Sequence, residues 1–241
     1  MNSIGEASVS LDIILLAYNE AATIETEILS WRRDVLSHFD NATIIVGEDG
    51  SSDGTTEILS KLHNLGIIYH DTTSERRGYV NALLSALHRS KGDWVFFADT
   101  GNKFRAIDFW KLFNSRNQFD LVTAYRHPRH DQIYRRCLTV VYSFVVKQMF
   151  PKHQLRDADS GFRLYSRELI EFILSSQLLF KDFVTSEISI RATAANFLHT
   201  EIEVSYYQRD GKSRGIPTKS ILYKSWRALR ALNELKREIS N

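Results

Sequence analysis

Acidic residues follow three of the apolar runs in the first hundred residues. These acids are Glu20 after the run 11–17, Asp49 after the run 43–46, and Asp99 after the run 94–98. Carboxylates at such positions can accept hydrogen bonds from a ligand or bind a hard metal ion, which usually needs at least two oxygen ligands. Asp99 has no second acid beside it, because Thr100, Gly101, Asn102 and Lys103 follow it. The question is what charge partners Asp99.

The elements that must position these acids are predicted by the apolar pattern. Nearly continuous apolar runs are typical of strands buried on both faces of a parallel sheet. The expected strands are 11–17, 43–46, 67–69 and 94–98, and the expected helices are 21–39, one ending near 64, and 79–90. Four such β–α units predict an α/β fold, a three-layer α/β/α sandwich with a mostly parallel central sheet. Ligands bind such sheets beyond the carboxyl ends of the strands, where the three acids stand.

The second half of the chain is less regular, and it contains no segment that looks like a linker. The expected strands are 119–125, 161–165 and 198–206, and the expected helices are 133–150, 167–174, 184–195 and 218–239. The last helix carries an apolar stripe surrounded by basic residues. It is expected to pack on the sheet, to form a homodimer, or to lie on an anionic membrane. We therefore expect a single domain over residues 1–241.

Composition excludes several classes of protein. The chain has 241 residues, of which 43% are hydrophobic and 25% charged, and its formal net charge is +2, which gives no indication of nucleic-acid binding. Its one cysteine, Cys137, suits a reducing compartment. Residues 1–10 lack the apolar core of a signal peptide, and the apolar run 137–146 is too short to span a bilayer. These features predict a cytoplasmic protein, with peripheral contact at the inner face of the membrane left open.

Sequence motifs narrow the function further. The chain lacks GxGxxG after its first strand, GxxxxGK[ST], and GxSxG, which disfavours dinucleotide-binding dehydrogenases, P-loop NTPases, nucleotidyltransferases and hydrolases with a nucleophile elbow. Six other segments occur in a fixed order: LLAYNE, GEDGSSDGT, SERRGYVNAL, FFADTGNKF, DADSGFRLYSRE and EVSYYQRDGKSR. Together they resemble glycosyltransferase family 2, of GT-A type, and most closely its dolichyl- and polyprenyl-phosphate sugar transferases. The resemblance extends from Leu11 to about Arg214.

This resemblance implies an inverting transferase that uses a nucleotide diphosphate sugar of UDP or GDP type. Residues 11–104 would bind the donor, residues 105–215 the acceptor, and 218–239 would form the amphipathic helix. The donor-site residues implied by the family are Ala17, Tyr18, Glu20, Asp49 and Arg77. Such residue types suit the donor, since an aromatic ring can stack on a base, a carboxylate can accept from a base N–H, and an arginine can bind phosphate.

The chain departs from the family pattern at the metal site. The family usually has Asp-x-Asp followed by a glutamine, and Asp99, Gly101 and Lys103 stand at these three positions. Mg²⁺ or Mn²⁺ could still be held by Asp99 together with diphosphate oxygens. Alternatively Lys103, helped by Arg126, replaces the metal, and metal dependence is weak or absent. The remaining alternative is a catalytically degenerate protein that binds a nucleotide or sugar and acts through a partner.

The acceptor side is predicted from the second half of the chain. Arg126 resembles the arginine that faces phosphate in the family, and Asp157 the acid before Ser-Gly-Phe. A hydroxyl acceptor needs a base, for which Asp157 is the candidate and Asp159 a rival, whereas a phosphate acceptor needs none. The other implied residues are Arg135, Glu187, and, in a basic loop that closes on the donor phosphates, Arg209, Ser213 and Arg214. The acceptor is expected to carry a phosphate or hydroxyl group, and polyprenyl phosphate is the first choice.

Overall fold

The computed structural model describes residues 9–73, 75–129, 133–207 and 221–240. Its strands are β1 (Leu11–Ala17), β2 (Ala42–Glu48), β3 (Tyr69–Asp71), β4 (Trp94–Asp99), β5 (Leu121–Arg129), β6 (Phe162–Ser166) and β7 (His199–Tyr206). Its α-helices are α1 (Ile24–Asp34), α2 (Thr55–Asn64), α3 (Tyr79–Arg89), α4 (Phe109–Phe113), α5 (Ile133–Met149), α6 (Arg167–Ser175), α7 (Val184–Ala194) and α8 (Ile221–Ser240). Two 3₁₀ turns lie at Leu36–His38 and Ala106–Asp108.

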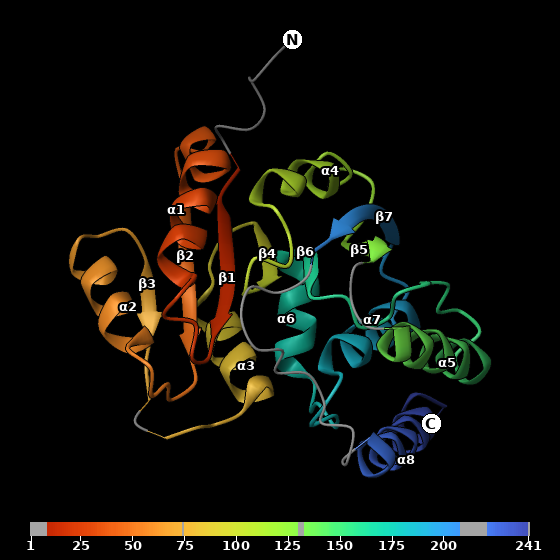
Figure 1. Ribbon diagram of the computed structural model, residues 1–241. Helices are drawn as coiled ribbons and strands as arrows, with labels where there is room; N and C mark the ends of the chain where they lie inside the picture. The colour runs from red at the N-terminus through yellow and green to blue at the C-terminus, as the bar shows by residue number, and fades with distance from the viewer. Residues whose placement is uncertain (1–8, 74, 130–132, 208–220, 241) are drawn as a thin grey trace.

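The strands form one sheet in the order β3-β2-β1-β4-β6-β5-β7 (Figure 1). Neighbouring strands run parallel except for β6, which is antiparallel to both β4 and β5. The predicted mostly parallel sheet is therefore confirmed. Because β1, β2 and β4 are parallel neighbours, their carboxyl ends lie at the same edge of the sheet.

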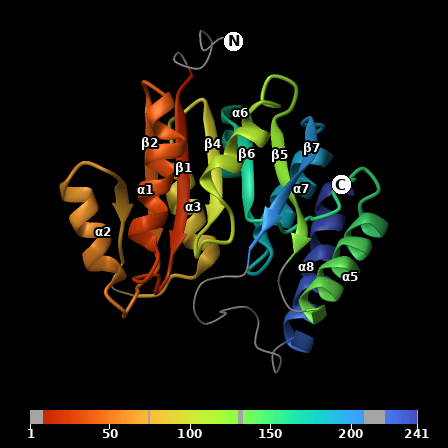
Figure 2. The same cartoon turned by 45° about the horizontal axis from the view of Figure 1, so that its top comes forward.

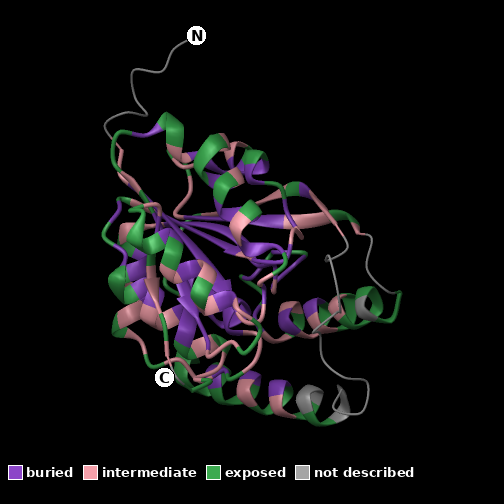
Figure 3. Cartoon of the chain, turned by 60° about the vertical axis from the view of Figure 1, so that its left-hand side comes forward, coloured by how far each residue is buried: buried purple, intermediate pink, exposed green. Residues whose placement is uncertain are grey.

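Helices cover both faces of the sheet, as a three-layer sandwich requires. One apolar cluster joins the sheet to α1, α2 and α4, with Trp31, Phe96 and Phe162 in mutual contact at its centre. A second cluster joins the opposite face to α3, α6 and α7. Phe96 and Phe97 point into different clusters, as alternation along a strand predicts. Figure 3 shows the continuous band of buried strands between the two helical layers.

Two helices differ from their expected form. The first helix, predicted to reach residue 39, ends at Asp34, and Val35 leaves helical geometry before a 3₁₀ turn. The C-terminal helix packs beside α5 through Leu232 and Leu235, which are fully buried (Figure 2). However, Trp226 and Leu229 of the same predicted stripe are 57% and 45% exposed. Part of the stripe therefore packs, but among the described residues its cluster contains residues of α5 and α7 and none of a strand, so the helix does not pack on the sheet as expected.

Candidate functional site

Hydrogen bonds hold the loops after β1 and β2 against each other. The Asp49 N–H donates to the Ala17 carbonyl oxygen at 3.1 Å, and the Ser52 N–H donates to Asn19 Oδ1 at 2.7 Å. The backbone of Glu20 donates to Thr55 Oγ1 at 2.7 Å. Residues expected in one donor site from their order in the sequence are thus neighbours in space.

The loop after β4 joins the same cluster. Thr100 Oγ1 donates to the Leu16 carbonyl oxygen at 2.7 Å and lies 3.4 Å from Glu20 Oε1. Glu20 itself is buried. The loops that follow β1, β2 and β4 therefore meet at one edge, where the sequence predicts a polar cleft.

Asp49 is buried and already has hydrogen-bond donors from its own chain. Its Oδ1 accepts from the backbone N–H groups of Arg77 and Gly78 at 2.7 and 2.8 Å, at the start of α3. Its Oδ2 lies 3.5 Å from Arg76 Nε. The guanidinium of Arg76 stacks 4.1 Å from the Tyr18 ring centroid and its side chain is 61% exposed. A base that stacks on Tyr18 must use the opposite ring face or displace Arg76.

Arg77 is directed towards the end of β3. Its Nη2 lies 3.3 Å from Asp71 Oδ2, and Ser85 Oγ donates to the same oxygen at 2.7 Å. Both donors, together with Arg89, hold the pKa of Asp71 below its ordinary value although burial acts in the opposite sense. The predicted contact of Arg77 with phosphate would require this pair to open.

Asp99 lies in a close cluster with Lys103 and Tyr79. Lys103 Nζ is 3.1 Å from Asp99 Oδ2, and the Tyr79 hydroxyl donates to Asp99 Oδ1 at 3.2 Å. On its third side the carboxylate packs against Gly161, where a Cβ would overlap with it. The Asp99 N–H donates to the Gly161 carbonyl at 2.7 Å, which ties β4 to the start of β6. Gly161 therefore has a structural role, because a side chain at this position would displace the Asp99 carboxylate.

Glu27 is a site residue that the sequence analysis missed. It is buried on α1, and its Oε2 accepts from the Gly101 N–H at 2.9 Å, so it holds the turn between Asp99 and Lys103. The signal was present, because Glu27 falls on the apolar stripe that contains Ile24 and Ile28. Burial raises the pKa of Glu27 to about 7 in spite of its backbone hydrogen bonds.

The raised pKa of Glu27 predicts a pH-dependent stability. Its contribution is fully present below about pH 4.5 and is lost as pH rises to about 7. The difference between these two pKa values corresponds to roughly 3 kcal/mol in the free energy of unfolding. Because glutamine mimics the protonated acid, Glu27→Gln is expected to equal the wild type near pH 4.5 and to exceed it by about 1–3 kcal/mol at pH 8. Urea denaturation at both pH values measures this, and a constant difference between them would contradict it.

Arg126 and Asp157 form a buried ion pair between β5 and the loop before β6. Arg126 Nε lies 2.5 Å from Asp157 Oδ2 and its Nη2 lies 2.7 Å from Oδ1. Burial alone would raise the pKa of Asp157, but Arg126 holds it below its ordinary value. A carboxylate held in this way is a weak base. Arg126 is also close enough to Lys103 for its charge to act on the pKa of that ammonium.

Of the two rivals, Asp159 is the one whose pKa suits a general base. Burial raises its pKa to about 6, and it accepts one hydrogen bond from Thr185 Oγ1 at 2.6 Å. The loop that presents it is held by Arg163, which the sequence analysis did not single out. Arg163 is fully buried and donates to the carbonyl oxygens of Ala158 and Ser160 at 2.6 and 2.5 Å.

Glu187 makes its contacts inside the protein. It is completely buried, accepts from the backbone N–H groups of Leu179 and Phe180, and lies 2.9 Å from Arg191 Nε. This geometry favours a role in orienting Arg191 over binding an acceptor, and the burial of the carboxylate rules out a surface salt bridge.

A basic pocket lies beside the Arg126–Asp157 pair. It has a volume of about 420 Å³ and is bounded by the end of β5, the loop before β6 and α5. Its cationic lining residues are Arg126, Arg129, Arg136, Lys147 and Arg156. Arg136 lines this pocket, whereas the side chain of the predicted Arg135 lies outside the described residues. The predicted Arg209, Ser213 and Arg214 also lie outside them.

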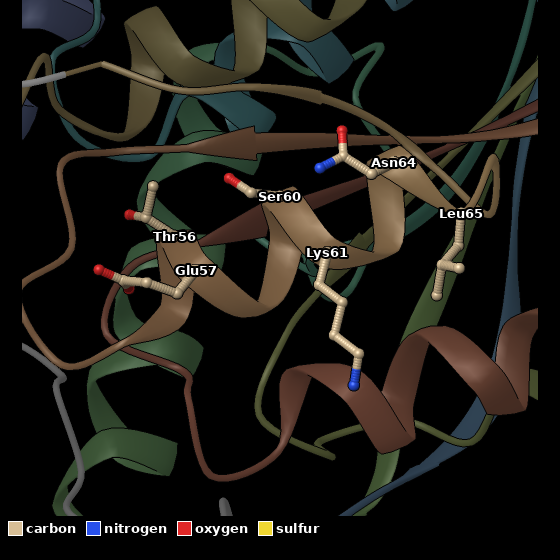
Figure 4. A pocket seen from close by; sticks show the side chains of 6 residues that line it. All are labelled: Thr56, Glu57, Ser60, Lys61, Asn64 and Leu65. Carbon is tan, nitrogen blue, oxygen red and sulfur yellow. The ribbon is translucent and has the colours of Figure 1, made fainter.

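A larger hollow of about 690 Å³ lies along α2. Figure 4 shows the side chains that line it, which project from one side of that helix. They are Thr56, Glu57, Ser60, Lys61, Asn64 and Leu65. None of the predicted site residues lines this hollow and it holds no paired titratable groups, so its size does not make it the functional site.

Among the described helices, none combines the length and apolar character needed to cross a bilayer.

Comparison with known proteins agrees with the family resemblance of the sequence motifs. The model of Glycosyl transferase family 2 matches residues 12–174. Glycosyltransferase AglD of Haloferax volcanii is 29% identical over 213 residues, which cover 83% of this chain and 33% of the relative. Undecaprenyl-phosphate 4-deoxy-4-formamido-L-arabinose transferase of Aeromonas hydrophila is 24% identical over 209 residues, covering 79% of this chain and 61% of the relative. The chain thus spans less than two thirds of either relative.

Among solved structures, glucosyl-3-phosphoglycerate synthase from Mycobacterium tuberculosis has the same fold. Its complex with Mn²⁺, uridine diphosphate and glucosyl-3-phosphoglycerate aligns with a TM-score of 0.72 at 20% identity, covering 95% of this chain and 80% of that chain. The predicted α/β sandwich of GT-A type is confirmed by this likeness.

Proposed function

This chain belongs to glycosyl transferase family 2, and on that premise we propose that it moves a sugar from a nucleotide diphosphate sugar to a phosphate-bearing acceptor. The observation that carries the proposal is the basic pocket next to the donor-side cluster. Arg126 connects the two, since it lines the pocket and lies 5.3 Å from the ring centroid of Tyr206, whose neighbour Tyr207 donates to the Lys103 carbonyl oxygen. UDP is the first choice of donor nucleotide, because the similar synthase binds it.

Transfer to a phosphate requires no general base. An acceptor phosphate oxygen attacks the sugar C1 from the face opposite the donor diphosphate and forms the new C–O bond. The bond from C1 to the donor oxygen breaks, and its electron pair leaves with the nucleoside diphosphate. A phosphate acceptor is already ionised near neutral pH, so Asp157 can remain paired with Arg126 throughout. Asp159 would serve as the base only for a hydroxyl acceptor.

The chemistry of the pocket favours a lipid-linked phosphate such as polyprenyl phosphate. Its cations suit a phosphate group, and on the same wall Val140 and Phe144 of α5 are 68% and 61% exposed. Exposed apolar side chains beside a cationic pocket match an acceptor with a charged head and an apolar chain. The similar Aeromonas transferase is named for undecaprenyl phosphate, whereas the similar synthase binds a water-soluble phosphoglyceric acid derivative.

The same surface favours peripheral contact with an anionic membrane. Near the exposed face of α5, helix α8 exposes Tyr223 and Trp226 to 60% and 57%, and carries the exposed Arg230. Apolar side chains among basic ones are typical of helices that lie on membrane surfaces. In this arrangement the pocket would open towards the lipid that carries the acceptor.

The test is sugar transfer by the purified chain with polyprenyl phosphate and with 3-phosphoglyceric acid as acceptors. We expect transfer to the lipid from a UDP or GDP sugar. In Val140→Ser/Phe144→Ser the KM for the lipid should rise about tenfold with little change in kcat, because the change removes apolar contact with the chain. The matched control is Leu65→Ser, which removes an exposed leucine directly after α2. Nucleotide binding without transfer to any phosphate acceptor would contradict the proposal.

A further inference from the structure

Lys103 is a cation in the turn that follows β4. It follows β4 by four residues and lies 3.1 Å from Asp99 Oδ2, at the edge where the strand-end loops meet. We propose that the Lys103 ammonium supplies the cationic charge of the donor site, so that nucleotide binding and sugar transfer do not depend on a divalent metal. This inference rests on the proposed function and specifies how that site handles charge.

The residues around Asp99 do not fit a divalent ion. One carboxylate oxygen faces Lys103 Nζ and the other accepts from the Tyr79 hydroxyl. Gly101 brings no side chain to the turn, and one oxygen of the nearby Glu27 already accepts from the Gly101 N–H. Among the described residues, no group of three or more histidine, cysteine, aspartate or glutamate side chains could hold a metal ion. Any ion next to Asp99 would also be repelled by the ammonium.

Lys103 remains charged although it is largely buried. Burial alone would lower its pKa, but the charge of Asp99 and the hydrogen bond to it raise the pKa above its ordinary value. An ammonium has three N–H donors, and the described contacts assign one of them to Asp99. The other N–H groups can therefore donate to diphosphate oxygens without loss of the Asp99 pair.

The backbone around Lys103 is held on both sides. The Tyr207 N–H donates to the Lys103 carbonyl oxygen at 2.9 Å, and Glu27 binds the Gly101 N–H. Asp99 fixes the far end of the side chain. A charge held in place before the ligand arrives requires little reorganisation during the reaction, which is the condition for effective electrostatic stabilisation.

The proposed step keeps the proton on Lys103. As the bond from C1 to the diphosphate oxygen breaks, negative charge grows on the leaving nucleoside diphosphate. The ammonium N–H groups donate to its oxygens and stabilise that charge, while the acceptor oxygen forms the new bond to C1. One C–O bond forms as another breaks, so the step requires no metal, oxidant or proton transfer.

The first measurement is nucleotide binding by the intact chain. UDP, GDP, CDP and dTDP are titrated calorimetrically, each in excess EDTA and in 1 mM Mn²⁺. We expect at least one to bind with dissociation constants that agree within about twofold in the two conditions. A site that required the metal would lose tenfold or more in affinity in EDTA, which would overturn the inference while leaving the proposed function intact. Binding of none in either condition would overturn both.

Variants of Lys103 provide the second measurement. In EDTA, Lys103→Gln should weaken nucleotide binding about tenfold, as expected for loss of one charge-assisted hydrogen bond, and should lower kcat about 10²–10³-fold. Lys103→Arg, which keeps the charge, should recover most of the binding. The matched control is Lys111→Gln, because Lys111 is half exposed and pairs with Asp108 outside the site. Circular dichroism confirms that each variant is folded. Unchanged binding and kcat in a folded Lys103→Gln would overturn the inference.

Discussion

Replacing Arg126 with methionine is expected to lower the free energy of unfolding by about 3–5 kcal/mol and to abolish measurable transfer. Asp157 is 2% exposed, and Arg126 supplies both hydrogen bonds to its carboxylate oxygens. Removing one partner of a buried pair leaves the other charge without compensation, which costs more than the pair itself contributes. Transfer is lost as well, because Arg126 lines the basic pocket.

Denaturation in urea measures the stability change, and two further variants identify its cause. In Arg126→Met/Asp157→Asn both charges are gone, so most of the lost stability should return, although transfer should not. Arg33→Met removes an arginine from an exposed pair with Asp34 and should leave the free energy of unfolding nearly unchanged, because solvent screens such pairs. Equal losses in Arg126→Met and the double variant would show that the buried charge is not the cause.

The pH dependence of Arg126→Met provides an independent check. In the wild type, Arg126 holds the pKa of Asp157 below its ordinary value, so the pair contributes stability that is present above about pH 4 and lost on further acidification. Without Arg126, burial is opposed only by the smaller effects of Arg129 and Arg163, so that pKa should rise. The deficit of the variant relative to the wild type should therefore shrink as pH falls from 7 towards 4, because the carboxyl can be protonated.

The sheet could be predicted largely because its strands are apolar on both faces. β1 matches its expected range of residues 11–17, since every residue in it is buried. β6 was predicted as a strand, but its antiparallel direction depends on contacts with β4 and β5 that are distant in sequence. The short helix α4 was not predicted, because its five residues, FWKLF, are too few to show a helical period.

The site was predictable where a residue follows a strand, and less so where it lies within a helix or a buried network. The order of motifs brought Glu20, Asp49 and Asp99 to the same edge. Glu27 was missed because a single acid on an apolar stripe shows no partner in the sequence. Arg163 was missed because most of its partners are carbonyl oxygens, which every residue carries and which only the fold brings together. The roles of all these side chains in catalysis remain predictions.

Replacing Gly161 with alanine should reduce transfer about 100-fold while the protein stays folded. The new Cβ would overlap with the Asp99 carboxylate, which packs directly on Gly161. Because the Gly161 carbonyl accepts from the Asp99 N–H, the two backbones cannot easily separate, and the side chain must turn instead. Turning it would break the contacts with Lys103 and Tyr79. A displacement of about 1 Å in a catalytic group can cost about this much in rate.

A double-mutant cycle separates this overlap from a general loss of stability. Gly161→Ala alone is expected to lower the free energy of unfolding by about 1–3 kcal/mol, as overpacking of a tight contact does. In an Asp99→Ala background the carboxylate is absent, so the same change should cost less than about 1 kcal/mol. An equal cost in both backgrounds would place the clash elsewhere. Nucleotide binding to Gly161→Ala should weaken along with transfer, since an unpaired Lys103 is no longer held towards the diphosphate by Asp99.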